Sequence, residues 1–591
     1  MVGHTKSMFI SFFGGIMLKL MKYLKPFFGT ISVAIILIFI QAITELLLPN
    51  YMSDIVDFGI VKGDTGYIYR IGGLMILIAF LGSACSIFAG FLSARVSAGI
   101  AMNLRNDIFS QIEGFSLIDI NKFGTASLIT RTTNDVYQIQ NVVFISLRMI
   151  VSAPTTMIGG IILATQKNSN MSWIFVASVP ILIIVVGIIS AKGFPLFKSV
   201  QAKLDKLNLI IRENISGIRV IRAFDRKELQ NEKYDNANSD LTNTSLRVNR
   251  ILSLLMPALM LILNLTSVTI LWVGSRRIEK GLLMVGDMMA FIQYSTLILI
   301  SFVMLSMMFI ILPRGSASAA RINEVFETKL SIEDTNYLKN ADERKGYLEF
   351  RNVTYSYPNS HEPAIDSISF TAEPGQVTGI IGSTGSGKST LVNMILRFYE
   401  PTKGQVLVDG VDVREMSQQQ LREKVGYVPQ KAVLFSGTIA ENIRYGKETA
   451  SDEEIAKAAS IAQAKDFIEE KTHKYESHVA QGGANFSGGQ KQRLCIARAL
   501  VRQPEIYVFD DSFSALDAKT DAKLRAALKQ ETKNSTVIIV SQKVSSIMNA
   551  DRIIVLDNGR VAGIGRHKDL ILNCEVYQDI VASQFKREEA Q

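Results

Sequence analysis

Glycine, serine and lysine are spaced as a phosphate-binding loop in the second half of the chain. The run reads Gly382-Ser-Thr-Gly-Ser-Gly-Lys-Ser389, between an apolar strand predicted at 376–381 and a helix predicted at 390–398. Glycines let backbone N–H groups turn toward phosphates, and the helix N-terminus adds positive potential. In such a loop Lys388 reaches the β- and γ-phosphates, and Ser389 offers its hydroxyl to Mg²⁺. The spacing therefore predicts a site for ATP and Mg²⁺.

Polar side chains at the ends of two further predicted strands could complete this site. Gln430 follows one strand and could bind Mg²⁺ or place a water molecule, while Asp510 ends the apolar run 506–510 and should hold Mg²⁺ through water. Between them, Phe486-Ser-Gly-Gly-Gln490 precedes a predicted helix. Each feature alone is weak, but their order behind the phosphate loop makes them reinforce one another.

The first half of the 591-residue chain has a different composition from the half that carries these residues. It is rich in Ile, Leu, Met and Phe, and hydrophobic residues make up 48% of the whole. The net charge of +9 fits basic residues near the cytoplasmic surface of a membrane. Because Lys and Arg form no basic tract, we expect no nucleic-acid partner. Three widely separated cysteines, Cys85, Cys495 and Cys574, show no metal-ligand spacing.

Six apolar stretches are long enough to cross a bilayer, which takes about 20 residues. They lie near 27–49, 71–93, 141–165, 171–191, 251–274 and 288–312. An even number of spans puts both chain ends on one side, and the predicted ATP site requires that side to be the cytoplasm. The connections on this side, 94–140 and 192–250, carry apolar residues at three- and four-residue intervals. We therefore expect the spans to continue as long helices with a turn at each tip.

Polar residues inside the first span form a pair. Gln41 and Glu45 lie one helical turn apart. A charge at bilayer depth is costly and usually faces a cavity or a partner. One interpretation is that Glu45 contacts a transported solute. The alternative, which we favour, is that Glu45 pairs with another residue of the protein or lies near the membrane interface.

Over nearly its whole length the sequence resembles the ATP-binding cassette (ABC) exporters. Phe486–Gln490 resembles the family's signature motif, whose usual form is Leu-Ser-Gly-Gly-Gln, and Gln430 matches the Q-loop glutamine. Tyr357 matches the aromatic that stacks on adenine, and Ser514–Asp517 matches the D-loop. The segment 213–224 resembles a coupling segment of the family. The resemblance implies a half-transporter that dimerises, with each ATP between one chain's phosphate loop and the other chain's signature.

Besides Phe486 in the signature, three positions depart from the family pattern. Asp511 stands where the family has the Glu that polarises the attacking water, and it is shorter by one methylene, which is an error of about 1 Å. Gln542 replaces the switch His that contacts the γ-phosphate, and Gln481 replaces a common Glu before the signature. The signature itself is nearly intact. The chain thus resembles the degenerate-site subunit of heterodimeric bacterial multidrug exporters, with a site that binds ATP and hydrolyses it weakly.

This resemblance implies a full set of site residues. Asp511, Gln542 and Asp517 take the catalytic positions, and Ser389, Gln430 and Asp510 the Mg²⁺ positions. The nucleotide-binding residues are Tyr357, Gly382, Ser383, Thr384, Gly385, Ser386, Gly387, Lys388, Ser389, Thr390, Gln430, Asp510, Phe486, Ser487, Gly488, Gly489 and Gln490.

The expected architecture is a six-helix transmembrane domain with the type I exporter (type IV ABC) fold, followed by an α/β P-loop nucleotide-binding domain. The expected divisions are 1–25, an N-terminal extension or elbow; 26–315, the transmembrane domain; 316–345, a linker; 346–585, the ABC ATPase; and 586–591, a tail. We expect a multi-pass protein of a bacterial plasma membrane, with its ATPase domain in the cytoplasm. Its partners would be the bilayer, a second half-transporter and a small amphiphilic substrate such as a drug, lipid or peptide.

Three alternatives stay open at this point. A homodimeric exporter would use Asp511 as a slow base. An ATP-gated or regulatory membrane subunit would not pump, and an importer could use the same fold. Turnover by the chain alone, uphill transport in vesicles and the direction of transport would separate them.

Overall fold

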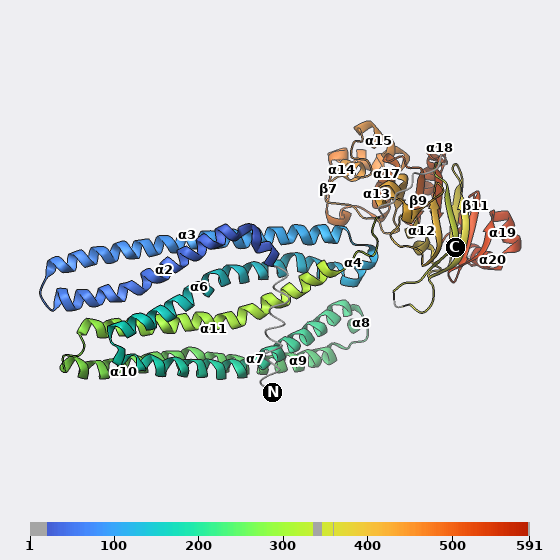
Figure 1. Cartoon of the computed structure of the whole chain (residues 1–591). Coiled ribbons are helices and arrows are strands. Elements are labelled where there is room, and N and C mark those ends of the chain that lie inside the picture. Colours follow the sequence, from blue (N-terminus) through green and yellow to red (C-terminus); the bar gives the residue numbers. More distant parts are fainter. Residues whose placement is uncertain (1–20, 335–344, 359, 589–591) are drawn as a thin grey trace. The chain divides into compact units, whose positions relative to one another are not determined.

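A computed structural model describes residues 21–334, 345–358 and 360–588, which fall into two compact units (Figure 1). The helical unit holds residues up to Glu113 and Thr125–Thr328, and the α/β unit holds Gly114–Gly124 and the chain from Lys329 onward. Most of the extension or elbow predicted at 1–25, and the last residues of the predicted tail, lie outside the described residues.

Six helical segments of the helical unit are long and apolar enough to cross a membrane, which confirms the six predicted spans. The helices are η1 (Met21–Phe27), α2 (Phe28–Asp54), η2 (Ile55–Ile60), α3 (Thr65–Glu113), α5 (Thr125–Thr130), η3 (Arg131–Asp135), α6 (Val136–Lys167), η4 (Ser169–Met171), α7 (Trp173–Ser216), α8 (Ile218–Ala223), α9 (Lys227–Ser253), α10 (Leu255–Glu279) and α11 (Val285–Glu327).

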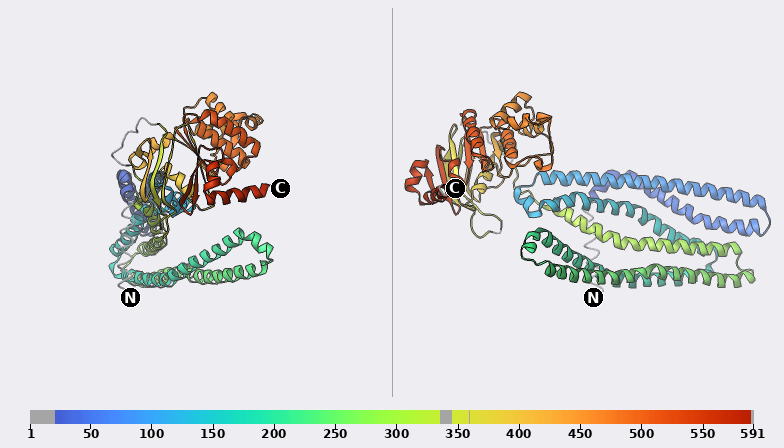
Figure 2. Two further views of the ribbon diagram at one scale, coloured as in Figure 1. Left: turned by 90° about the vertical axis from the view of Figure 1, so that its right-hand side faces the viewer. Right: turned by 180° about the vertical axis from the view of Figure 1, so that it is seen from behind.

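The spans continue beyond membrane thickness as helices, as predicted. α3 alone has 49 residues, or about 74 Å at 1.5 Å per residue, against a hydrocarbon core of about 30 Å. α7 and α9 lie side by side and are joined at their tip by α8 (Figures 1 and 2). α11 continues to Glu327, so the helix enters the segment predicted as a linker at 316–345.

Small residues bring the spans together. α2 packs along α3, and α6 packs along α11 (Figure 1). A Cβ at Gly82 of α3 would collide with Thr44 Oγ1 of α2, and a Cβ at Gly315 of α11 would lie 2.5 Å from Val142 of α6. Side chains larger than glycine would push these helix pairs apart, since interiors are close-packed.

The α/β unit is built on three sheets. A four-stranded antiparallel sheet has the order β2-β1-β4-β5, and a six-stranded sheet has the order β12-β11-β3-β10-β9-β6. In the six-stranded sheet all neighbours are parallel except β12 with β11. The strands are β1 (Leu348–Tyr355), β2 (Ile365–Ala372), β3 (Val377–Gly382), β4 (Lys403–Val408), β5 (Val411–Asp412), β6 (Val425–Val428), β7 (Gly437–Thr438), β8 (His478–Val479), β9 (Ile506–Asp510), β10 (Thr536–Val540), β11 (Arg552–Asp557) and β12 (Arg560–Gly565).

The central strands β9 and β10 are buried along their whole length, and parallel sheets covered on both faces read as continuous apolar runs. The helices of this unit are α4 (Leu117–Phe123), α12 (Lys388–Ile395), η5 (Val413–Glu415), α13 (Gln418–Lys424), α14 (Ile439–Arg444), α15 (Asp452–Ile461), α16 (Lys465–Glu469), η6 (Lys474–Glu476), η7 (Gln481–Gly483), α17 (Gly488–Val501), α18 (Ala518–Glu531), η8 (Val544–Ser546), α19 (His567–Asn573) and α20 (Glu575–Glu588).

The short helix α4 belongs to the α/β unit although it lies between two membrane helices in the sequence. Leu117 and Ile118 pack against the core that contains β1, β2 and β4. Asp119 accepts hydrogen bonds from Ser116 at the helix start and from the Ser331 hydroxyl at 2.5 Å. Burial alone would raise the pKa of Asp119, but the hydrogen bonds from Ser331 and Ser116 outweigh burial and lower it.

Candidate nucleotide site

The predicted phosphate loop joins β3 to α12. Gly385 and Gly387 have φ of 85° and 93°, in the left-handed region that glycine adopts without strain. A Cβ at Gly387 would also lie 2.8 Å from the Ala364 carbonyl oxygen. Between the glycines, Ser383, Thr384 and Ser386 form the turn, which a bond from Ser386 N to Ser383 O (3.2 Å) closes.

The ammonium group of Lys388 lies against this loop. Its Nζ donates to the carbonyl oxygens of Gly382 (2.9 Å) and Ser383 (2.6 Å), and the side chain is buried. Burial lowers the pKa of Lys388, while Asp511 and Asp510 act in the opposite direction. A cation is thus held among backbone groups at a helix N-terminus, an arrangement that binds phosphate.

Two oxygen groups meet beside the loop. Ser389 Oγ lies 3.4 Å from Asp510 Oδ1, across the edge where β9 ends. Asp510 is buried, and burial raises the pKa of this carboxyl, with the hydrogen bond from Ser389 opposing the rise. Hydroxyl and carboxylate oxygens are the ligands that Mg²⁺ prefers, so the two residues fit this ion.

Asp511 occupies a constrained position directly after β9. Its φ is 46°, and its backbone N–H donates to the Val540 carbonyl oxygen (3.0 Å) at the end of β10. Gln430, which follows β6, places Nε2 at 3.4 Å from Asp511 Oδ2. Burial raises the pKa of Asp511, and the hydrogen bond from Gln430 and the charge of Lys388 oppose that rise. The structure therefore brings Gln430 and Asp511 together.

Gln542 lies after β10, and its side chain is exposed. Its backbone carbonyl accepts a hydrogen bond from Gln584 Nε2 (2.7 Å) in α20, and Gln584 Oε1 accepts from Val544 N (2.8 Å). The C-terminal helix thus holds the backbone of the loop that presents Gln542. Sequence reasoning missed Gln584, because it lies 42 positions away and belongs to no motif.

Tyr357 lies next to the start of α12. Its hydroxyl is 2.9 Å from Thr390 Oγ1, and its ring stands edge-on to those of Tyr355 and Tyr399 at 5.1 and 5.6 Å. The side chain is 39% exposed. The neighbouring rings and Thr390 hold the Tyr357 ring in place while part of it stays exposed to solvent, so the ring is suited to stack on a flat base.

The signature residues form the start of α17. Ser487 Oγ accepts from Gln490 N (3.3 Å), and Gln490 Oε1 accepts from Ser487 N (3.0 Å), so the two residues form a reciprocal capping box. Ser487 and Gly488 are exposed, and a Cβ at Gly488 would meet open space. Phe486, by contrast, is buried against Phe467, with the Lys471 ammonium 4.4 Å from its ring centre.

The D-loop residue Asp517 caps the next helix, α18. Its Oδ1 accepts from Thr520 N (2.9 Å), and the hydrogen bonds from Thr520 lower the pKa of Asp517. The side chain is exposed. The signature and D-loop therefore present an exposed surface with two capped helix starts.

The chain matches two families along its length. Residues 31–303 match the ABC transporter transmembrane region, and residues 365–514 match ABC transporter. An uncharacterized ABC transporter ATP-binding protein of Mycobacterium tuberculosis is 40% identical over 96% of this chain and 97% of its own length. Two such proteins of Bacillus subtilis, YfiB and YfiC, are 38% and 29% identical over 97% of this chain, and over 99% and 95% of their own lengths.

A solved structure has the same fold. The structure of a bacterial Atm1-family ABC exporter with ATP bound aligns with a TM-score of 0.79 and 25% identity, over 94% of this chain and 98% of that one. The fold and the phosphate loop define a membrane ATPase coupled to transport. The chain belongs to the ABC transporter family, as an exporter-type half-transporter with six membrane helices followed by a P-loop ATPase domain.

Proposed function

We propose that this chain is the degenerate-site subunit of a heterodimeric exporter. It binds ATP and Mg²⁺ at its own phosphate loop through Lys388, Ser389 and Asp510, and hydrolyses ATP weakly there. Its signature, centred on Ser487 and Gly488, completes the active site of a partner chain that carries the catalytic Glu and His. ATP binding closes the paired domains, and hydrolysis in the partner's site resets them.

The observation that carries this proposal is the difference between the two parts of the phosphate site. Lys388 and Asp510, which would hold phosphate and Mg²⁺, are buried, and Ser389 Oγ lies 3.4 Å from Asp510 Oδ1. The positions that would act on water are Asp511 and Gln542. The Asp511 carboxylate is one methylene short, and a misplacement of about 1 Å at a catalytic group is costly. Gln542 is neutral and cannot share a proton with the γ-phosphate as a histidine would.

Two related half-transporters in one organism are what a heterodimer needs, and Bacillus subtilis has two that match this chain. The substrate class we propose is amphiphilic, because the six spans are apolar with few charges. A homodimer with Asp511 as a slow base is the competing assignment. An importer or an ATP-gated subunit would need the same site, so only transport assays distinguish them.

The deciding experiment is the ATPase rate of the purified chain in lipid, with Lys388→Ala as the control for contaminating activity. A rate no higher than that of Lys388→Ala, together with binding of a labelled ATP analogue, supports the proposal. Addition of the partner should then restore turnover. A robust rate that Lys388→Ala removes would show a working homodimer and would overturn the assignment of a degenerate site.

Coupling between ATP use and the spans is proposed to pass through the tips near 113–124 and 210–224. α8 buries none of its residues, and Phe224 beside it is 73% exposed, so this tip has apolar surface to offer. The Gly217 N–H donates to the Glu213 carbonyl oxygen (2.8 Å) where α7 ends. Gly217→Pro removes that donor, and it should abolish transport while ATP binding persists; intact transport would contradict this route.

A further inference from the structure

A polar pocket opens between α2 and α3 within the membrane-spanning region. Its volume is about 240 Å³, and its charged group is the carboxylate of Glu45. The other lining residues are Gln41, Thr44 and Leu48 from α2, and Ala79, Gly82, Ser83 and Ser86 from α3. α2 and α3 approach each other closely at Thr44 and Gly82, which both line the pocket, and both helices belong to the same unit.

No Lys, Arg or His of the described residues forms an ion pair with Glu45. Gln41 Nε2 donates to Glu45 Oε1 at 3.0 Å. Thr44 turns its hydroxyl back to the Gln41 carbonyl oxygen (2.7 Å). Ser83 and Ser86 form no hydrogen bond within the described part of the chain, so their oxygens are available to a ligand. A carboxylate within a membrane-spanning segment is costly without a cation.

Several other acidic groups of the helical unit have cations, whereas the buried Asp57 accepts hydrogen bonds from Gly286 N (2.7 Å) and Ser53 Oγ (3.4 Å). Lys167 Nζ lies 3.0 Å from Asp287 and 3.5 Å from Asp54, and Asp135 pairs with Arg321. Glu45 therefore differs from these ion-paired carboxylates by its missing counter-ion.

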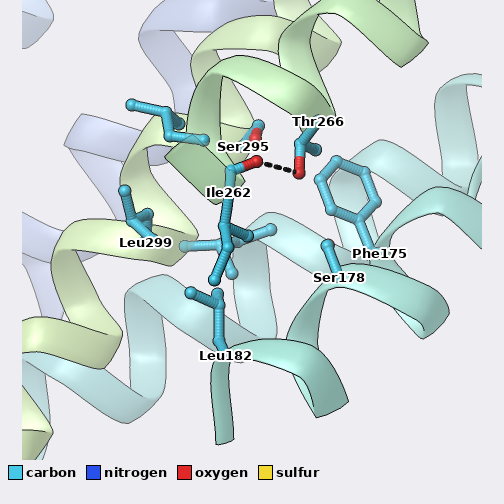
Figure 3. Close-up of a pocket in the computed structure, with 9 residues that line it drawn as sticks. Phe175, Ser178, Leu182, Ile262, Thr266, Ser295 and Leu299 are labelled. Carbon is cyan, nitrogen blue, oxygen red and sulfur yellow. Dashed lines mark hydrogen bonds between the residues drawn. The ribbon is translucent and has the colours of Figure 1, made fainter. Parts of the chain in front are cut away.

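A second cavity in the same unit lacks the features of a binding site and serves as a comparison. It lies among α7, α10 and α11 (Figure 3), has a volume of about 10 Å³ and is lined by no ionisable residue. Its Thr266 hydroxyl is satisfied by the Ile262 carbonyl oxygen at 2.7 Å. That space holds one water molecule at most, whereas the Glu45 pocket has room for a small charged group.

We propose that the pocket between α2 and α3 binds the positively charged head of a cationic amphiphile, with Glu45 as its counter-ion. The volume fits an ammonium head and excludes the whole of a drug-sized molecule. Ile76 and Phe80 lie on α3 three residues before the lining residues Ala79 and Ser83; they are 73% and 74% exposed and offer apolar contact for the tail. This inference rests on the proposed export function, and it narrows the proposed substrates from amphiphiles in general to cationic amphiphiles.

The test measures binding without ATP, so its outcome is independent of the degenerate-site proposal. The full chain in nanodiscs is titrated with tritiated dodecyltrimethylammonium, and binding to empty nanodiscs is subtracted. Glu45→Gln should weaken binding by about tenfold or more, because the quaternary ammonium group, which has no N–H to donate, loses the negative charge that faces it. Ala79→Leu, which fills the pocket without changing charge, should weaken it similarly. Glu279→Gln, an exposed carboxylate at the end of α10, should leave binding unchanged.

Competition identifies the chemistry that is recognised. Unlabelled dodecyltrimethylammonium should displace the label, and 1-dodecanol, with the same tail and no charge, should not. Equal affinity of wild type and Glu45→Gln, or equal competition by dodecanol, would overturn the proposal, because the site would then recognise apolar surface alone. Loss of binding when the partner chain is added would also overturn it, since the pocket would then be a subunit contact.

Discussion

The α/β unit presents two surfaces with motifs for nucleotide contact, and they differ in where their unusual residues lie. At the phosphate loop the departures are Asp511, half-buried beside Gln430, and Gln542, which is exposed. At the signature the departure is Phe486, which is buried in the core against Phe467. Substitutions on functional side chains change chemistry, and a substitution in a core changes packing. The comparison fits the proposal that the phosphate-loop site is altered in its chemistry and that the signature surface is intact.

The strongest test of the intact surface is Gly488→Asp. The position is exposed and open, so a carboxylate fits without disturbing the fold, but it would repel the γ-phosphate held by a partner. We expect ATP hydrolysis by the two-chain complex to fall by about a thousandfold. Ala484→Asp adds the same charge at an exposed position before the signature and should leave the rate unchanged. A fully active Gly488→Asp complex would show that this signature serves no active site.

Restoring the catalytic pair tests the altered surface. The double variant Asp511→Glu and Gln542→His adds one methylene to the carboxylate and introduces an imidazole, the two groups that the proposal holds to be missing. We expect hydrolysis by the chain alone to rise about a hundredfold, the scale of a positioned acid–base group. Asp557→Glu, at the last residue of β11, lengthens a carboxylate by the same methylene at a position outside the phosphate loop and the other site motifs. An unchanged rate in the double variant would mean that these two residues do not limit hydrolysis.

Removing the aromatic platform probes nucleotide binding, which both the degenerate and the homodimeric assignments require. Tyr357→Ala should weaken binding of a labelled ATP analogue about tenfold, because base–aromatic stacking contributes about 1–3 kcal/mol. Tyr357→Phe keeps the ring and loses only the contact with Thr390 (2.9 Å), so it should bind nearly as wild type. Equal weakening in both variants would assign the effect to the hydroxyl rather than to stacking.

The smallest effect is expected for Phe486→Leu, which restores the family's usual residue. The buried ring contacts Phe467 and lies near Lys471. Its replacement by a smaller apolar side chain should change the free energy of unfolding by less than about 1.5 kcal/mol, measured by denaturant titration. Hydrolysis by the two-chain complex should stay unchanged. A large change in the hydrolysis rate would show that Phe486 affects catalysis and not only packing, which would contradict the comparison between the two surfaces.

The sequence by itself determined the features that depend on local spacing. The six spans follow from runs of apolar residues, and the phosphate loop follows from a strand, glycines and a helix start that are contiguous in the chain. The long helical connections follow from their three- and four-residue periodicity. These features need only neighbours in sequence, so their physical causes are visible without a fold.

Only the tertiary structure decided which distant groups meet. Gln430 and Asp511 lie 81 positions apart and come together because β6 and β9 are parallel neighbours that end at one edge. Asp119 and Ser331 lie 212 positions apart, and their bond helps to place α4 with the α/β unit. The missing counter-ion of Glu45 likewise depends on how α2 packs on α3. Such pairs depend on sheet order and helix packing, which local patterns do not specify.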